Sequence, residues 1–167
     1  MDLNGEIAAC IPRLRRYARA LVGDGGAADD LVQDTLERAW SKIHLWQRGA
    51  ALRPWLFGIM HNLHIDQLRR RHGATVSLDE LDVEIPVRAT QDDMSDMHDL
   101  QGALRLLPLE QREVLLLVAV EQMTYKDAAR ALGIPPGTLM SRLARGRERL
   151  RTLLEGRSQI VPLKVVK

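Results

Sequence analysis

The segment from Thr124 to Leu150, TYKDAARALGIPPGTLMSRLARGRERL, decides the fold of this chain. Thr124 lies three residues before Asp127, which is the spacing of a capping box and predicts the start of a short helix. Gly133 predicts the end of that helix. The turn at 134–137 then leads into a second helix from about Thr138 to Glu155. An alanine-rich helix, a glycine-containing turn and a second helix together predict a helix-turn-helix.

The second helix of this motif carries arginines on its outer side. Leu139, Leu143 and Leu150 recur at helical spacing and should face the core. The outer side would then hold Ser141, Arg142, Arg145, Arg149 and Arg151. An α-helix fits the major groove of DNA, where arginine binds base edges and phosphates. The motif therefore indicates DNA binding, and a solvated arginine-rich helix within a bundle is the alternative.

Charge changes sign along the chain in three blocks. Residues 1–72 hold 11 Lys and Arg against 8 Asp and Glu, residues 73–101 hold 1 against 8, and residues 102–167 hold 12 against 6. The two basic blocks favour a polyanionic partner. The acidic block contains Pro86 and lacks a sustained helical period, so it indicates a flexible linker.

Apolar periodicity predicts helices on both sides of this linker. In the first half they cover about Ile7–Val22, interrupted by Pro12; Ala27–His44, with Asp29 and Asp30 in the first turn and Trp40 on the apolar face; and Pro54–Arg71. In the second half, helices are expected from near Met97 to Pro108 and over Leu109–Val120. We therefore expect an all-α protein of two small helical domains, at 1–73 and 97–157, with an acidic flexible linker at 74–96 and a tail at 158–167.

The composition argues against an enzyme, a metal site and a membrane protein. Cys10 is the only cysteine, which excludes a disulfide framework. His61 and His64 lie one turn apart without further metal ligands nearby, and no set of nucleophile, base and acid stands out. No apolar run approaches about 18 residues, and no signal peptide is visible. We expect no cofactor, no metal, no membrane insertion and a cytoplasmic location.

Three blocks of sequence occur in an order that identifies a family. Residues 29–40, DDLVQDTLERAW, are followed by RPWLFGIMHN at 53–62 and IDQLRRR at 65–71. The third block comprises LPLEQREV at 107–114 and GTLMSRLARGR at 137–147. The segments between residues 29 and 71 resemble the second region of the bacterial extracytoplasmic-function (ECF) sigma factors of RNA polymerase. The segments at 107–114 and 137–147 resemble the fourth region of the same family.

The resemblance implies a sigma factor that binds core RNA polymerase and directs promoter-specific initiation, without catalysis of its own. It implies that polymerase is contacted by Asp30, Gln33 and Asp34. It implies that the loop at 45–52 and Asn62 capture a flipped minus-ten base, with Arg69, Arg70 and Arg71 also binding DNA there. It implies that the minus-thirty-five element is contacted by Thr138, Ser141, Arg142, Arg145 and Arg149. Met140 stands where many relatives have Lys or Arg, so one contact is expected to be missing.

Other roles for these residues remain open. The carboxylates at 29–34 could cap a helix, Asn62 could be a surface amide, and the three arginines could complement a helix C-terminus. The resemblance further implies a stress-responsive protein held by an anti-sigma factor. Two alternatives are a sigma-like mimic that sequesters an anti-sigma factor, and a two-domain helix-turn-helix repressor or activator. Such mimics are response regulators with an attached receiver domain, for which this sequence has no room.

Overall fold

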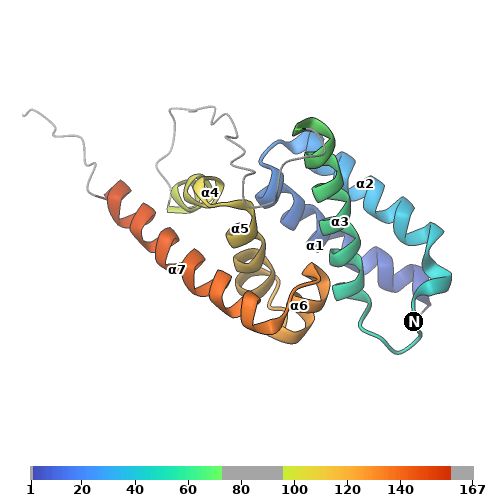
Figure 1. The fold of residues 1–167 in the computed structure, drawn as a ribbon. Coiled ribbons are helices and arrows are strands. Elements are labelled where there is room, and N and C mark those ends of the chain that lie inside the picture. Colours follow the sequence, from blue (N-terminus) through green and yellow to red (C-terminus); the bar gives the residue numbers. More distant parts are fainter. Residues whose placement is uncertain (1, 73–95, 159–167) are drawn as a thin grey trace, which may run out of the picture.

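The computed structural model describes residues 2–72 and 96–158, which form two helical units packed against each other (Figure 1). All elements in these two ranges are helices, so the all-α fold class is confirmed. The expected linker at 74–96, apart from Asp96, lies outside the described residues, as does the expected tail beyond Ser158. None of the described helices is long and apolar enough to span a membrane.

The first unit consists of α1 (Leu3–Val22), α2 (Gly25–Ser41), the 3-10 helix η1 (Ile43–Leu45) and α3 (Leu52–His72). Helix α1 begins four residues before the expected start because the Asp2 carboxylate accepts a hydrogen bond from the Gly5 N–H at 3.0 Å. Pro12 lies inside α1, and the helix neither ends nor restarts there.

Helix α2 also begins earlier than expected, which changes the interpretation of its acidic residues. Asp24 is the N-cap, and its carboxylate accepts from the Ala27 N–H at 2.9 Å. The first turn of α2 contains no acidic residue, so the expectation that Asp29 and Asp30 lie there is wrong. The placement of Trp40 on the apolar face is also wrong, because this side chain is 52% exposed.

The second unit consists of α4 (Asp96–Leu106), α5 (Leu109–Leu115), the π-helix η3 (Leu116–Val120), α6 (Tyr125–Leu132) and α7 (Pro136–Ser158). The single helix expected over 109–120 is thus an α-helix that widens into a π-helix. The Thr124 hydroxyl caps α6 by accepting from the Asp127 N–H at 3.1 Å, and Gly133 ends it at φ 64°. Elements α6 and α7 form the expected helix-turn-helix.

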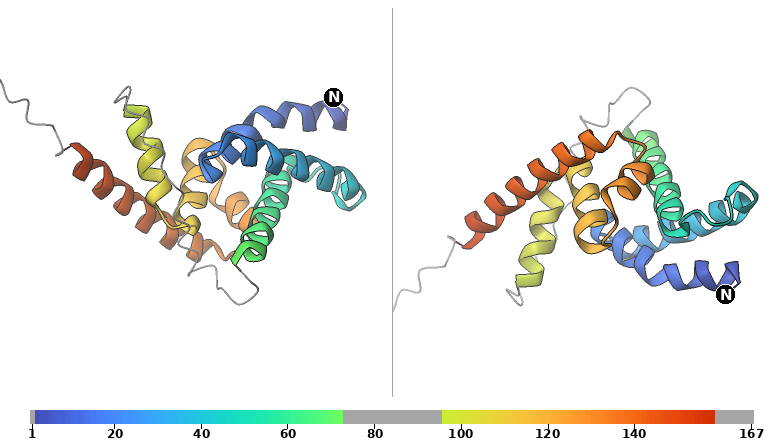
Figure 2. Two further views of the ribbon diagram at one scale, coloured as in Figure 1. Left: turned by 90° about the horizontal axis from the view of Figure 1, so that it is seen from above. Right: turned by 90° about the horizontal axis from the view of Figure 1, so that it is seen from below.

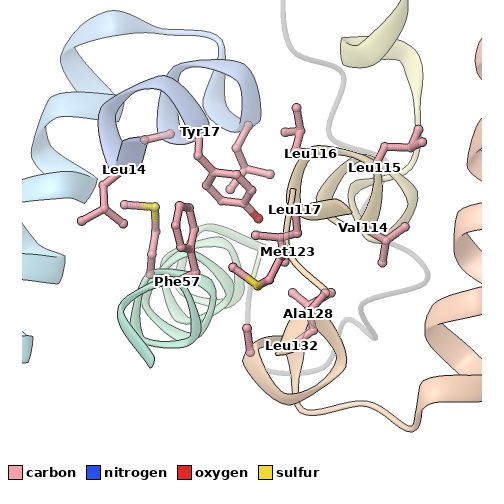
Figure 3. Close-up of a cluster of buried hydrophobic side chains, with 14 of the residues drawn as sticks. Leu14, Tyr17, Phe57, Val114, Leu115, Leu116, Leu117, Met123, Ala128 and Leu132 are labelled. Atoms are coloured by element: carbon pink, nitrogen blue, oxygen red, sulfur yellow. The ribbon is translucent and has the colours of Figure 1, made fainter. Parts of the chain in front are cut away.

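The two units share one hydrophobic core (Figure 3). The rings of Tyr17 in α1 and Phe57 in α3 meet edge to face, with centroids 5.0 Å apart. They lie opposite Leu117 and Met123 of the second unit. Helix α6 packs directly on α3, as all three ribbon views show (Figures 1 and 2). Two separate domains on a flexible linker were expected, and this docking was not predicted.

Candidate polymerase and nucleic-acid interface

One face of α2 collects the residues expected to bind polymerase. Asp30, Gln33 and Asp34 are all exposed, and at about 100° per residue they fall within one third of the helix circumference. Glu37 extends the same face, and its carboxylate accepts from the Gln33 amide at 3.3 Å. Because Asp24 caps the helix instead, none of the three residues is needed for capping.

This face continues onto α3 across a cleft. The cleft is lined by Asp34, Glu37, Arg38 and Ser41 of α2 and by Leu63, Asp66, Gln67 and Arg70 of α3. The Gln67 amide donates to the Asp34 carboxylate at 3.3 Å and so joins the two walls. The cleft carries acidic, basic and amide groups side by side, which suits a polar protein surface as partner. Glu37 and Gln67 were not predicted as site residues, although the helical spacing of Glu37 from Gln33 and Asp34 places it on the same face.

The α3 residues expected near the minus-ten element do not all share a face. Asn62 and Arg69 are exposed and seven residues apart, which places them on nearly the same side of the helix. Arg70 lies about a quarter turn away from them and lines the cleft with α2. Arg71 falls on the opposite side and is close enough to His64 to influence its pKa. The structure therefore joins Asn62 to Arg69 but separates both from Arg71.

Helix α7 brings all of its expected DNA contacts onto one face. At about 100° per residue, these residues occupy an arc of roughly 100°; they are Thr138, Ser141, Arg142, Arg145 and Arg149. The adjacent arc is buried and holds Leu139 and Leu143. Measured from the middle of this arc, Arg147 lies about 170° and Arg151 about 130° away, and Arg151 is bound to Glu148 at 2.6 Å.

Ser141 and Arg142, near the start of this face, already bond to other groups of the protein. The Ser141 hydroxyl donates to the Thr138 carbonyl at 3.0 Å. Arg142 pairs with Glu110 of α5 at 3.4 Å and is only 26% exposed. Arg145 and Arg149 are exposed. Within the described residues, the face therefore combines these two exposed arginines with an arginine oriented by α5.

Helices α5 and α7 approach closely beneath this face. A Cβ added to Gly146 would lie 3.1 Å from Leu115 Cδ1 and 3.3 Å from Gln111 Cβ. Such contacts are tighter than those of ordinary packing, so glycine at this position allows the two helices to pack together. This contact fixes the helix that presents the cationic face.

Buried charged residues of the second unit bond to the first unit, and none of them was predicted to do so. The buried Glu121 accepts from Arg16 of α1, and the buried Glu113 contacts His61 of α3. Arg112, also buried, donates to the Leu21 carbonyl. Nothing in the local pattern distinguishes these three residues from surface charges.

Burial at this junction shifts several pKa values. It lowers the pKa of His64 to about 4, and electrostatic interactions with the neighbouring His61, Arg112 and Arg71 lower it further. Burial also lowers the pKa of Arg112 and raises that of Tyr17 well above its usual value. Among the described residues, no three His, Cys, Asp or Glu side chains gather to hold a metal ion.

Comparison with known proteins supports the division into two sigma-like parts. Residues 7–61 match the family model of the sigma2 domain of PhyR, and residues 97–150 match that of sigma-70, region 4. Over 92% of its length the chain is 37% identical to the ECF RNA polymerase sigma factor EcfG of Rhodopseudomonas palustris (strain TIE-1), 85% of which is covered.

Solved structures agree with this assignment. The sigma factor RpoE, crystallised with the anti-sigma factor NepR from Bartonella quintana, superposes with a TM-score of 0.76 at 34% identity, over 92% of this chain and 97% of that chain. The anti-anti-sigma factor PhyR from Bartonella quintana, also in complex with NepR, shares the fold with a TM-score of 0.59 at 23% identity, over 87% of this chain and 49% of that chain. The identity and coverage with EcfG show that the chain belongs to the ECF RNA polymerase sigma factors.

Proposed function

We propose that the chain binds core RNA polymerase through the α2 face and directs promoter-specific initiation of transcription. In this proposal residues 1–73 bind polymerase and the minus-ten element, and residues 97–157 read the minus-thirty-five element. The observation that carries the proposal is the single face of α7 that gathers all five expected contacts, including the exposed Arg145 and Arg149. A helix with such a face fits the major groove.

The α2 face is the proposed polymerase contact because its exposed carboxylates are not needed to cap the helix. Asp30 is exposed and does not cap the helix, and within the described residues Asp34 accepts a long hydrogen bond from Gln67 at 3.3 Å. Exposed carboxylates of this kind steer and orient a basic partner. Replacing Asp30, Gln33 and Asp34 together by alanine should weaken binding to core polymerase and leave the helical content nearly unchanged.

The matched control for this triple variant is Glu148→Ala with Glu155→Ala. These substitutions also remove two carboxylates, but from α7 rather than α2. A pull-down with core polymerase compares the two proteins, and circular dichroism verifies that both remain folded. Equal retention of polymerase by both variants would refute the proposed contact.

At the minus-ten element, Asn62 and Arg69 are the proposed pair on α3. Asn62 offers an exposed amide that can read the edge of an unstacked base, and Arg69 on the same side can meet the adjacent phosphates. Run-off transcription with core polymerase and a promoter library tests the function as a whole. A promoter-dependent transcript is expected, and its absence with every promoter would contradict the proposal.

We also propose that an anti-sigma factor holds this protein until a stress signal releases it. Support comes from RpoE, 34% identical to this chain, whose structure was solved with NepR bound. Recovery of a small inhibitory partner from native cells, together with loss of transcription when that partner is added, is the expected result. Recovery only as free protein or polymerase complex would count against an anti-sigma factor.

The match of residues 7–61 to the sigma2 domain of PhyR favours a second candidate, a mimic that captures an anti-sigma factor. The two functions differ in one measurement. A sigma factor supports run-off transcription, whereas a mimic binds the anti-sigma factor but yields no transcript. The higher identity to EcfG, 37% against 23% for PhyR, favours the sigma factor.

A further inference from the structure

We propose that Glu110 of α5 is a positioning residue that holds Arg142 of α7 in the orientation needed to read one guanine of the minus-thirty-five element. Glu110 does not touch the DNA in this proposal and acts through the arginine beside it. The inference rests on the proposed function, because it concerns how one residue of the α7 face selects a promoter. It goes beyond that function by assigning a role in base choice to α5, the helix that packs on α7.

The ion pair of Glu110 and Arg142 joins two helices at the edge of the core. Arg142 Nη2 lies 3.4 Å from Glu110 Oε2, and the two side chains are 26% and 24% exposed. Partial burial reduces the screening of the attraction by water and salt. The pair therefore restricts the direction of a long arginine side chain, which has many rotamers when it is fully exposed.

A second ion pair on α7 differs from this one in exposure and in attachment. Arg151 Nη2 lies 2.6 Å from Glu148 Oε1, but both side chains are 64% exposed and both belong to α7. An exposed pair on one helix contributes little to a fixed geometry, because water competes for both charges. In contrast, Glu110 belongs to α5, whose close packing on α7 is set at Gly146. The Glu110 carboxylate is therefore held at a defined place relative to α7.

The guanidinium of Arg142 keeps nitrogen atoms with which it can bind a base. Arginine carries five N–H donors in a planar fork, and within the described residues the ion pair with Glu110 involves Nη2. The other donors match the O6 and N7 acceptors that guanine presents together in the major groove. Arg142 lies in the second turn of α7, near the end of the helix that reaches base edges in a helix-turn-helix. Guanine is therefore the base that this arginine is suited to read.

Orienting the arginine before binding favours base choice over general attraction to DNA. An exposed arginine such as Arg145 loses rotamer freedom when it binds, whereas Arg142 is already restricted in the free protein. The Glu110 carboxylate also offsets the positive charge of Arg142 and repels nearby phosphates. A duplex without the guanine therefore gains little from Arg142. Glu110 thus raises the preference for the promoter and lowers the affinity for DNA of other sequences.

Glu110 also has a structural alternative, which makes a different prediction. It lies in the first turn of α5, where a carboxylate is favoured by the positive end of the helix dipole. A purely structural role predicts that its loss lowers stability and leaves the choice of base unchanged. A positioning role predicts that its loss changes the choice of base at a single position. Base preference, rather than affinity or stability, therefore separates the two roles.

The test measures binding of the full chain, assembled with core polymerase, to the strongest promoter of the run-off library. Each guanine of the minus-thirty-five element, on either strand, is replaced in turn by 7-deazaguanine, which keeps O6 and has a C–H group in place of the N7 acceptor. Wild type should bind at least one of these duplexes about fivefold more weakly than the parent promoter. The guanine whose replacement no longer matters in Arg142→Ala is the one assigned to Arg142.

Glu110→Gln, which keeps the size of the side chain, and Glu110→Ala should both lose most of the sensitivity to the assigned guanine. They should bind a scrambled duplex of the same length at least as tightly as wild type does. Any base position at which Arg145→Ala loses preference should be unaffected in both. The matched control is Glu148→Gln, which removes a carboxylate from the exposed pair with Arg151 and should keep the full sensitivity to the assigned guanine. Circular dichroism verifies that each variant keeps its helices.

Three results would overturn the positioning role of Glu110. They are full sensitivity to the assigned guanine in both Glu110 variants, an equal loss in Glu148→Gln, and the failure of Arg142→Ala to abolish sensitivity at any guanine. In each case wild type still selects the promoter, so the proposed function is left intact. A wild-type protein that binds the promoter and the scrambled duplex equally would contradict the proposed function together with this inference.

Discussion

Burial keeps His64 neutral in the folded protein and makes stability depend on pH. The side chain is 7% exposed, and its pKa is about 4 instead of 6.5. The unfolded chain therefore takes up a proton first as the pH falls. The stability due to neutral His64 is complete above pH 6.5 and is lost as the pH falls towards 4. This loss should reach about 3 kcal/mol in the free energy of unfolding.

Urea denaturation at several pH values between 7 and 4 measures this dependence. His64→Gln cannot take up the proton, so its stability should fall by about 3 kcal/mol less than that of wild type over this range. The same substitution at the exposed His72 should retain the wild-type loss. Parallel stability curves for wild type and His64→Gln would show that His64 is not the group responsible.

The buried charged residues show what a sequence does not reveal at the scale of single residues. Arg16 and Glu121 are separated by 105 positions, and His61 and Glu113 by 52. Each residue alone has the polarity of a surface group, and no local period connects it with its partner. Such pairs depend on how the two units dock, which the helical periods within each unit do not specify.

At the scale of elements, the sequence was more informative because helix phase follows from spacing alone. The five expected DNA contacts of α7 share one face, and Leu139 and Leu143 are buried beside it. Boundaries were less predictable: Asp2 and Asp24 cap their helices earlier than the apolar periods suggested. The π-helix η3 was also missed, since an apolar run such as LLVAV has no pattern that distinguishes it from an α-helix.

The face of α7 leads to a prediction about four arginines. Arg145 and Arg149 lie on the proposed DNA face, whereas Arg147 and Arg151 lie on another side of the helix. Arg145→Ala should weaken the free energy of promoter binding by about 1–3 kcal/mol and relax the base preference at one position of the minus-thirty-five element. Arg149 lies farther along the helix, so Arg149→Ala should weaken binding to all promoter sequences alike. It should also lower the slope of the logarithm of the binding constant against the logarithm of salt concentration by about one.

Arg147→Ala and Arg151→Ala are the matched controls, because they remove the same charge from the same helix. Binding of polymerase holoenzyme to a panel of single-base promoter variants, at several salt concentrations, measures all four proteins. A change in base preference with Arg149→Ala instead of Arg145→Ala would mean that the reading surface lies one turn further along α7. Equal losses from all four variants would indicate a general charge effect rather than a recognition face.

At the scale of the whole molecule, the two-unit division was predictable from charge blocks and helical periods, but the docking was not. The two units approach each other closely at Gly58 of α3, where an added Cβ would lie 3.2 Å from the Ala131 carbonyl oxygen of α6. A small residue in a helical pattern indicates a close neighbour without identifying it. The neighbour here is 73 positions away in the sequence, beyond the reach of any local pattern.

This contact allows the docking of the two units to be tested by a substitution that changes no charge. In Gly58→Ala the new methyl group meets backbone, so α6 must move by a few tenths of an ångström. Because α3 and α6 belong to different units, undocking relieves the contact without disturbing either helix, and alanine itself favours helix by about 1 kcal/mol. We therefore expect Gly58→Ala to keep its helical content while the two units separate more often.

Fluorescence energy transfer between dyes on α2 and on the C-terminal half of α7, far from the α3–α6 contact, measures this separation. Transfer efficiency should be lower in Gly58→Ala than in wild type. The matched control is Gly156→Ala, because a Cβ at this α7 position meets nothing within 4 Å and gains the same helix preference. If both alanine variants transfer energy as efficiently as wild type, α6 has room to adjust and the close contact does not control docking. If both transfer less, the change arises from the helices themselves rather than from the junction.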